Sequence, residues 1–506
     1  MAPPGPKPPN ALTARRLGLD TQDEAMVFVR SDSPVCRSEG FSAHSRVQLT
    51  NGTRSIIATL YQTSTNLVSD HEIGLSEAAW RLLGLVEGGQ ISVSHPAPLE
   101  SLKMVRGKVF GQRLDDASTR AIISDIVAGR YSDIHLSSFV TACSALPLDL
   151  AETIALTRAM VDTGSRITWG HAPIADKHCV GGLPGNRTTP VIVAICASLG
   201  LTIPKTSSRA ITSPAGTADT MEVLTDVDLD LESMRQVVDQ EGGCFIWGGG
   251  VQFSPADDAL IRIERALDLD SEGALVASVL SKKIAAGATH VVIDIPVGPT
   301  AKVRSLSAAS SLQSLIEKVA SEFGLAVLAL VTDGTQPVGR GIGPALEARD
   351  VLQVLRNDPD APADLADRAC LIAGALLELT GKAPSGTGKA MALNALRTGT
   401  AYSKFESICR AQGGFRPPVL AEHYRPFLAP APGRVASIDN RRLARVAKLA
   451  GAPGDKAAGV DLHVRLGDTV KAGQALYTLY TQTPGELAYA IDYVTANPDI
   501  IELTRP

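Results

Sequence analysis

The spacing of apolar residues changes along the chain. Between residues 25 and 98, short apolar runs bounded by Gly, Asn and Ser predict strands at 26–29, 56–60 and 91–93. Helical spacing follows, because apolar residues recur at i, i+3, i+4 and i+7 behind Asp133 as the expected cap, at Leu136, Phe139, Val140 and Cys143. Another helix is predicted from about residue 272 to 286. These patterns predict a small β-rich domain that ends near residue 98, with a helical region after it.

Two continuous apolar runs, at 290–295 and 325–331, predict buried strands of a parallel sheet covered on both faces. Each run leads into a polar loop that contains Gly and Pro, at 296–302 and 332–341. In open α/β sheets, ligands gather beyond the carboxyl ends of the strands. Lys302 is therefore a candidate ligand contact, although a lysine in such a loop is more often simply solvated.

Two loops combine glycines, hydroxyl groups and cations, at residues 176–189 (DKHCVGGLPGNRTT) and 205–217 (KTSSRAITSPAGT). Glycine lets the backbone approach a ligand closely, so that successive N–H groups point at its oxygens. Lys and Arg add charge, and Ser and Thr add hydrogen bonds. Two threonines before Pro190 predict a helix whose positive end faces the first loop. Each loop alone is typical of an ordinary turn; together they predict an anion site, and phosphate suits this inventory best.

Composition narrows the class of protein. The chain has 506 residues, 44% hydrophobic and 20% charged, which predicts two to four soluble globular domains. A net charge of −5 and 4% aromatic residues argue against nucleic-acid binding. The seven cysteines are scattered without metal-binding spacing, which suits a reducing cytoplasm and predicts no metal site. The Pro-rich start has no leader pattern and no apolar run is long enough to span a membrane, so we expect a cytoplasmic protein.

Three segments resemble the thymidine phosphorylase superfamily, the pyrimidine (class II) nucleoside phosphorylases. They are residues 177–182 (KHCVGG), 208–220 (SRAITSPAGTADT) and 277–283 (ASVLSKK). The resemblance covers nearly the whole chain and is closest to the long branch that includes the AMP phosphorylases, with its extra amino-terminal domain. Alternating runs after residue 430 also resemble the hairpins of lipoyl-type barrel-sandwich domains, in which we interpret Lys471 as an ordinary turn lysine.

The resemblance implies an α/β fold with a discontinuous helical domain and a parallel-strand-rich mixed sheet. Small domains would flank it, β-rich at the amino terminus and α+β, barrel-sandwich-like, at the carboxyl terminus. Members of the group are dimers or larger, so a homodimer or larger homo-oligomer is expected. The implied domains are 1–98 (β-rich, with a disordered Pro-rich start), 99–168 with 258–289 (helical), 169–257 with 290–425 (α/β, phosphate-binding) and 426–506 (α+β).

The implied reaction is phosphorolysis, in which inorganic phosphate attacks the anomeric carbon of an N-glycoside as the base leaves. Such an enzyme needs a phosphate cradle and hydrogen-bond donors near the departing base. No cofactor is implied, because inorganic phosphate is a co-substrate, and the partners are small molecules. Carried over by motif, the contacts to substrate or phosphate are Lys177, Gly182, Ser208, Arg209, Ala210, Ile211, Thr212, Ser213, Thr217, Ser278 and Lys302.

The resemblance also assigns Asp270 the position of the proton donor to the base in the AMP-specific branch. A carboxyl group near its reference pKa of about 3.9 is ionised at neutral pH. Donation therefore needs a pKa raised by burial or by nearby carboxylates, such as those of Asp268 and Glu272. The alternative role for Asp270 is a helix cap, since it precedes a predicted helix.

The two residues after Lys177 are open to more than one interpretation. His178 is a candidate general base or phosphate contact, and a structural histidine fits equally well. Cys179 stands where the short thymidine phosphorylases carry a serine, so that a backbone N–H would replace a hydroxyl contact there. A nucleophilic thiol is not expected, because phosphorolysis needs no covalent enzyme intermediate.

Two substrates fit the resemblance. A nucleoside 5′-monophosphate, AMP foremost, would give free base and ribose 1,5-bisphosphate, with Arg209 and its neighbouring hydroxyls around the second phosphate. Thymidine would give thymine and 2-deoxyribose 1-phosphate, with Ser278 and Lys282 on the pyrimidine.

Three alternatives come from other classes of protein. A phosphoribosyltransferase such as anthranilate phosphoribosyltransferase shares this fold but would need a metal-bound pyrophosphate site. A scaffold without activity is disfavoured because the Lys, Arg, Ser, Thr and Asp positions are intact. A flavin or NAD enzyme is disfavoured because no GxGxxG follows a first strand, and we interpret the glycines at 248–250 as a turn in the wall of the cleft.

Overall fold

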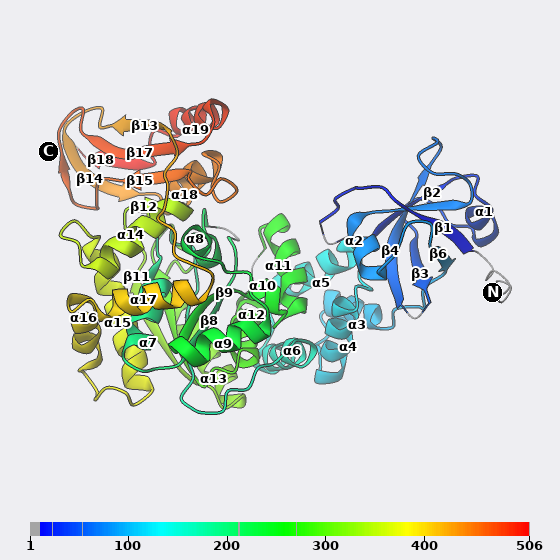
Figure 1. The fold of residues 1–506 in the computed structure, drawn as a ribbon, viewed down its shortest axis with the longest axis horizontal. Coiled ribbons are helices and arrows are strands. Elements are labelled where there is room, and N and C mark those ends of the chain that lie inside the picture. The colour runs from blue at the N-terminus through cyan, green and yellow to red at the C-terminus, as the bar shows by residue number, and fades with distance from the viewer. Residues whose placement is uncertain (1–10, 23, 53, 211–212, 270, 505–506) are drawn as a thin grey trace. The chain divides into compact units, whose positions relative to one another are not determined.

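The computed structural model describes residues 11–504 except residues 23, 53, 211–212 and 270. The chain divides into two compact units, Met1–Leu146 and Pro147–Pro506 (Figure 1). None of the helices formed by the described residues combines the length and the hydropathy that a membrane span requires.

The first unit begins with a closed barrel whose hydrogen-bonded strand order is β1-β5-β2-β4-β3-β6. Closure leaves no open sheet edge, and the inward side chains of its strands form a core of their own. The three strands expected in this region are present within β2, β4 and β6. The barrel elements are β1 (Ala11–Arg16), β2 (Met26–Arg30), α1 (Pro34–Glu39), β3 (Arg46–Asn51), β4 (Arg54–Thr63), β5 (Glu72–Leu75), α2 (Glu77–Leu83) and β6 (Gln90–Ser94).

Three helices complete this unit: α3 (Ser101–Val109), α4 (Asp116–Val127) and α5 (Asp133–Ala145). The apolar stripe expected around Leu136 is buried on α5. The cap lies one residue earlier than expected, because Ser132 is the N-cap and Asp133 is the first helical residue. The backbone N–H of Ser132 donates to His135 Nδ1 (3.2 Å), which satisfies a donor at the helix start.

The second unit starts with an alternation of strands and helices. Its elements up to residue 411 are α6 (Leu150–Thr163), β7 (Ala175–Cys179), α7 (Thr188–Ser198), β8 (Ile203–Ser207), α8 (Thr217–Leu224), α9 (Leu231–Glu241), β9 (Gly243–Trp247), α10 (Gly248–Val251), α11 (Pro255–Leu267), α12 (Glu272–Ala285), β10 (His290–Val297), α13 (Leu306–Glu322), β11 (Ala326–Asp333), β12 (Gly341–Ile342), α14 (Pro344–Arg356), α15 (Ala363–Leu379), α16 (Gly388–Arg397) and α17 (Thr400–Ala411).

All five longer strands of this part, β7 to β11, pair in parallel. The sheets β11-β10-β7 and β8-β9 are joined by an isolated parallel bridge between Ile174 and Thr202. Central strand β10 is buried on both faces as expected, since Val291 packs in one core with α12 and α13, and Val292 in another with α7 and α15. The expectation of a fully buried strand is wrong for β11, which lies at the sheet edge and exposes alternate residues such as Val331.

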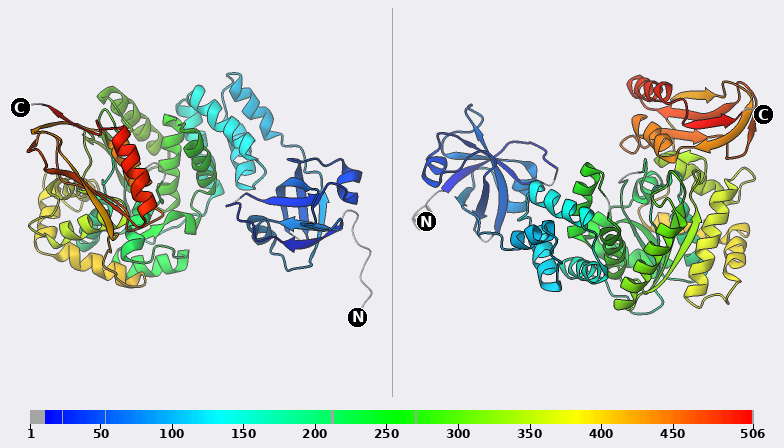
Figure 2. Two further views of the ribbon diagram at one scale, coloured as in Figure 1. Left: turned by 90° about the horizontal axis from the view of Figure 1, so that it is seen from above. Right: turned by 180° about the vertical axis from the view of Figure 1, so that it is seen from behind.

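The last part of the chain forms two antiparallel sheets, β12-β15-β17-β13 and β16-β14-β18, around one core (Figure 2). Strand β12 comes from the α/β part, so the two parts share a sheet. Lys471 is exposed in the turn between β16 and β17, as expected. The elements are β13 (His423–Leu428), β14 (Gly433–Ile438), α18 (Asn440–Leu449), β15 (Gly459–Leu462), β16 (Thr469–Val470), β17 (Ala475–Thr481), α19 (Pro484–Ala496) and β18 (Ile501–Thr504).

Candidate active site

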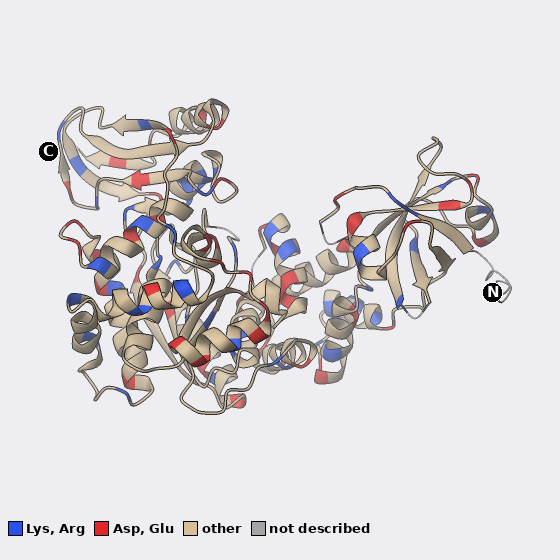
Figure 3. Ribbon diagram, in the orientation of Figure 1, with Lys and Arg blue, Asp and Glu red and all other residues tan. Residues whose placement is uncertain are grey.

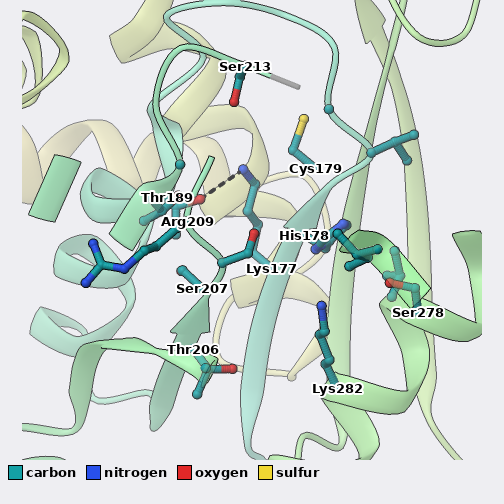
Figure 4. A pocket seen from close by; sticks show the side chains of 18 of the residues that line it. Lys177, His178, Cys179, Thr189, Thr206, Ser207, Arg209, Ser213, Ser278 and Lys282 are labelled. Atoms are coloured by element: carbon teal, nitrogen blue, oxygen red, sulfur yellow. Dashed lines mark hydrogen bonds between the residues drawn. The ribbon is translucent and has the colours of Figure 1, made fainter. Parts of the chain in front are cut away.

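A cavity of about 280 Å³ lies beyond the carboxyl ends of β7, β8, β9 and β10, with α11 and α12 forming its other wall. The glycines at 248 and 249, expected in a turn, line it from the first turn of the short helix α10. The structure brings most of the predicted contact residues to this one cavity (Figure 4). Those lining it are Lys177, Gly182, Ser208, Arg209, Ser213, Thr217, Ser278 and Lys302.

Ala210, which was also predicted as a contact, is not among the residues that line the cavity. The backbone N–H of Ala210 donates to Asp219 Oδ2 (2.6 Å), so this donor is already engaged within the protein. Ile211, Thr212 and Asp270 lie outside the described residues. Beside Asp270, Ser271 is the N-cap of α12 and its Oγ accepts from Ala274 N (3.2 Å). The cap of α12, the alternative role considered for Asp270, therefore belongs to Ser271.

The first loop depends on glycine at Gly182, where the backbone has a φ of +81°. A Cβ atom there would lie 2.7 Å from the backbone nitrogen of Lys302, so any side chain would push these two segments apart. The helix after this loop, α7, begins at Thr188 rather than at Pro190, so both threonines lie in its first turn. The first loop therefore packs directly against the backbone of Lys302.

Lys177 is 1% exposed, and its ammonium group reaches the start of α7. Its Nζ donates to Thr188 Oγ1 (2.8 Å) and lies 3.3 Å from Thr189 Oγ1 (Figure 4). Among the described residues no carboxylate forms an ion pair with it, and burial lowers its pKa. A buried ammonium with hydroxyl partners, beside the positive end of a helix, is stabilised by an anion.

Asp176, the residue before Lys177, holds two further buried lysines. Its carboxylate lies 3.1 Å from Lys205 Nζ on β8 and 2.8 Å from Lys283 Nζ on α12. Burial raises the pKa of Asp176, but the two ammonium groups outweigh burial, and the pKa lies below its ordinary value. Burial lowers the pKa of Lys283 to about 7. One carboxylate against two lysines leaves this wall of the cavity positive, and part of that charge titrates near neutral pH.

His178 and Cys179 are neutral in these surroundings. Burial, with the positive charge of nearby lysines led by Lys283, lowers the pKa of His178 well below its ordinary value. Burial and the neighbouring carboxylate of Asp294 raise the pKa of the Cys179 thiol to about 12. A protonated thiol is a poor nucleophile. The imidazole can offer a hydrogen bond but carries no charge.

Arg187 connects the first loop to the second. Its Nη1 donates to Thr217 Oγ1 (2.9 Å) and its Nη2 to the carbonyl oxygen of Ala215 (2.7 Å). Its Nε lies 2.6 Å from the buried Glu347 on α14. Burial raises the pKa of Glu347 despite this guanidinium. Arg187 thus holds the end of the second loop in place.

Arg209 lines the cavity but directs its charge to a neighbour. Its Nη1 and Nη2 donate to Glu222 (2.8 and 2.7 Å), and its guanidinium lies 4.9 Å from the centre of the Trp247 ring. Figure 4 shows this guanidinium pointing away from the Lys177 amine. The Arg209 hydrogen bond, together with Lys456, lowers the pKa of Glu222 to about 2.

Sequence reasoning did not select Asp176, Arg187 or Lys283 as part of the site. Apolar residues beside Asp176 in β7 and beside Lys283 in α12 are a signal for these two, since burial of a charge requires a partner. Arg187 stands between Asn186 and Thr188, and no such pattern marks it. Figure 3 shows that Lys and Arg are interspersed with Asp and Glu along the strands and helices of the second unit. Among the described residues, no group of three or more His, Cys, Asp or Glu side chains is placed to hold a metal ion.

Three family models match parts of this chain. Residues 171–402 match the a/b domain of a glycosyl transferase family, and residues 103–164 match the helical bundle domain of a glycosyl transferase family. Residues 434–500 match the pyrimidine nucleoside phosphorylase C-terminal domain.

Whole-chain relatives are also found. A protein of Chelativorans sp. (strain BNC1) named "Putative thymidine phosphorylase" is 58% identical over 504 residues, which cover 99% of each chain. A protein of Polaromonas sp. (strain JS666) with the same name is 59% identical over 495 residues, 98% of this chain and 97% of the relative.

A solved structure shares the fold. It is anthranilate phosphoribosyltransferase from Thermus thermophilus, with a TM-score of 0.52, 20% identity, and coverage of 61% of this chain and 98% of that one. At this identity it supports the fold alone. The expected α/β multi-domain architecture is confirmed, and so is the expectation of a pentosyltransferase. The chain belongs to the superfamily of thymidine phosphorylases and AMP phosphorylases.

Proposed function

We propose that this enzyme carries out phosphorolysis of a nucleoside 5′-monophosphate, AMP foremost, and releases free base and ribose 1,5-bisphosphate. The observation that carries phosphorolysis is the buried ammonium of Lys177, which has hydroxyl partners and lies at the start of α7. Inorganic phosphate beside Lys177, Gly182 and Lys302 supplies the missing negative charge.

The reaction proceeds by attack of a phosphate oxygen on the anomeric carbon while the bond from that carbon to the base nitrogen breaks. The sugar becomes oxocarbenium-like, and the bonding electrons move to the base. Asp270 in its protonated form donates a proton to the base. The cations Lys177 and Lys283 hold the attacking anion, and the neutral His178 offers a hydrogen bond.

The preference for a monophosphate rests on a second group of anion-binding residues. Arg209, Ser208 and Ser213 line the same cavity as Lys177 but come from the second loop. Two separate sets of donors suit two phosphate groups, one attacking and one carried by the substrate.

Thymidine is the second candidate substrate. The relatives at 58–59% identity are named for it, and Ser278 and Lys282 line the cavity. Lys282 Nζ lies 2.5 Å from Asp257, and this carboxylate outweighs the effect of burial and raises the pKa of the lysine. Lys282 is thus a charged donor beside Ser278.

The test is release of free base from AMP, CMP, UMP, adenosine and thymidine, each with and without inorganic phosphate. Phosphate-dependent release from AMP, with little from the nucleosides, is expected. Release from thymidine alone would replace the proposal with a thymidine phosphorylase.

The variant Arg209→Ala sharpens this test. If Arg209 binds the 5′-phosphate, its loss lowers kcat/KM for AMP by about 10- to 100-fold more than kcat/KM for adenosine, since one charge-assisted contact is removed. An equal loss for both substrates would show that Arg209 acts elsewhere.

A further inference from the structure

Four charged side chains lie against the second loop, and the proposed reaction uses only Arg209 among them directly. Two carboxylates come from α8, Asp219 and Glu222, and they face Arg209 and Lys456. Glu222 binds Arg209 with both oxygens, and its Oε2 lies 2.6 Å from Lys456 Nζ. Asp219 Oδ1 lies 3.4 Å from both Arg209 Nη1 and Lys456 Nζ. The cluster therefore holds two negative and two positive charges.

Asp219 couples this cluster to the backbone of the loop. Its Oδ2 accepts from Ala210 N (2.6 Å) and from Gly216 N (2.8 Å), so one buried oxygen holds two points of the loop together. The approach is close, because a Cβ on Gly216 would lie 2.5 Å from the carbonyl oxygen of Ser208. The charge balance around Asp219 therefore bears on the shape of the substrate-facing backbone.

Lys456 comes from the segment after α18 and is anchored independently of Arg209. Its carbonyl oxygen accepts from Ala345 N (2.9 Å) in the first turn of α14. The same helix carries Glu347, which binds Arg187. The Lys456 ammonium group is thus presented by backbone contacts that do not depend on the position of Arg209.

The two cations differ in what they can reach. Arg209 lines the cavity and lies over Trp247, which lines it too. In the described part of the chain, the ion-pair partners of Lys456 are the two carboxylates of the cluster alone. If Arg209 turns into the cavity, Glu222 loses a bidentate partner. A half-buried carboxylate without a cation is costly, and Lys456 at 2.6 Å removes much of that cost.

We propose that Lys456 is a positioning residue for the substrate phosphate. It holds Glu222 and Asp219 so that Arg209 can exchange its ion pair with Glu222 for one with the 5′-phosphate of a nucleotide. This inference rests on the proposed nucleotide substrate. It predicts that a residue of the carboxy-terminal region, outside the cavity, tunes the affinity for the phosphorylated substrate and leaves the attacking phosphate unaffected.

The test compares Lys456→Ala and Lys456→Gln, which remove the charge, with Lys456→Arg, which keeps it. Lys471→Ala is the matched control, because Lys471 is an exposed turn lysine in the same region. Loss of the charge should raise KM for AMP about tenfold and change kcat and the KM for inorganic phosphate by less than about twofold. Lys456→Arg and Lys471→Ala should resemble the wild type. A parallel rise in both KM values, or no change in either, would overturn the proposal.

A second measurement separates this inference from the proposed function. The Trp247 ring loses its cation when Arg209 moves, so tryptophan emission should change with AMP but not with adenosine or inorganic phosphate, and Trp247→Phe should abolish the change. The AMP midpoint should shift about tenfold in Lys456→Ala. A Lys456-dependent shift without base release would leave the inference standing and reject AMP as substrate. Base release from AMP without any Trp247 response would reject the inference alone, and absence of both would reject both.

Discussion

At the scale of single residues, the site depends on cations that are buried with too few carboxylates. Lys177 has hydroxyl partners, and Lys205 and Lys283 share Asp176. Burial disfavours an ammonium group, whereas a bound anion favours it. The charge of the site and its occupancy are therefore linked. Burial lowers the pKa of Lys283 to about 7, so this lysine is where the linkage should be measurable.

Anion binding is expected to take up a proton at Lys283. In the free protein the pKa of this lysine is about 7, and a bound anion raises it. At a pH between these two pKa values, anion binding therefore adds a proton to the lysine. Affinity therefore falls as pH rises through about 7. Titration calorimetry in buffers of different ionisation enthalpy measures this proton uptake. Sulfate is used as the anion because, unlike phosphate, it does not itself ionise near neutral pH. Lys283→Met should bind sulfate more weakly and without proton uptake; undiminished uptake would assign the proton to another group.

Asp270 is expected to act on turnover rather than on binding. Because amides cannot donate the proton of a carboxylic acid, Asp270→Asn should lower kcat by about 10²- to 10⁴-fold with little change in KM. Steady-state kinetics with the confirmed substrate measure this. Asp239→Asn is the matched control, since Asp239 is exposed on α9 and does not line the cavity. Wild-type kcat in Asp270→Asn would remove the general-acid role.

At the scale of elements, Arg187 links the start of α7 to α14 and to the end of the second loop. Its partner Glu347 is 1% exposed, so the pair is a buried ion pair with hydrogen bonds on both sides. Such a pair is weak evidence for stability as a whole, but the loss of one member leaves a buried charge without a partner. Glu347 is therefore the residue at which to test how the two loops are held.

Glu347→Gln is expected to lower the free energy of unfolding by about 3–5 kcal/mol, because the Arg187 guanidinium loses its buried counter-charge. Urea denaturation followed by circular dichroism measures this change. The exposed pair Lys389–Asp367 provides the control, and Asp367→Asn should cost less than about 1 kcal/mol. If both substitutions lowered the free energy of unfolding equally, burial of the Arg187–Glu347 pair would not increase the cost of losing a counter-charge.

At the scale of the whole molecule, the amino-terminal barrel has the properties of an independent folding unit. Its six strands close on themselves, and its core residues all lie between Leu12 and Val93. A chain segment with its own core and no open sheet edge can fold alone. The domain boundaries inferred from the resemblance and the expected homo-oligomer remain predictions.

A fragment of residues 11–98 is expected to fold by itself, because the contacts that form its core are internal. Circular dichroism should show a β-rich spectrum and a single cooperative thermal transition. The full chain, scanned under the same conditions, serves as the reference. A spectrum of an unfolded chain from this fragment would show that the barrel needs the rest of the protein.

Much of the fold follows from local pattern. The strands at 290–297 and 326–333 and the helix at 272–285 were expected within a few residues, because continuous apolar runs and helical spacing report burial directly. The exposed alternate residues of β11 were not expected, since a strand's place at the edge or centre of a sheet depends on the order of pairing. The apolar pattern of a single strand does not show which strands it will pair with.

The candidate site divides in the same way. The glycines and cations of two loops predicted an anion site, and the resemblance carried the family and the contact residues, eight of which line one cavity. Only the tertiary structure decided that Asp176 binds Lys205 and Lys283. It also decided that Glu222 binds both Arg209 and Lys456. Residue types and local spacing specify which groups a loop can present. Which of those groups are already paired depends on elements far apart in the chain, because ion pairing is set by distance and burial in the folded protein.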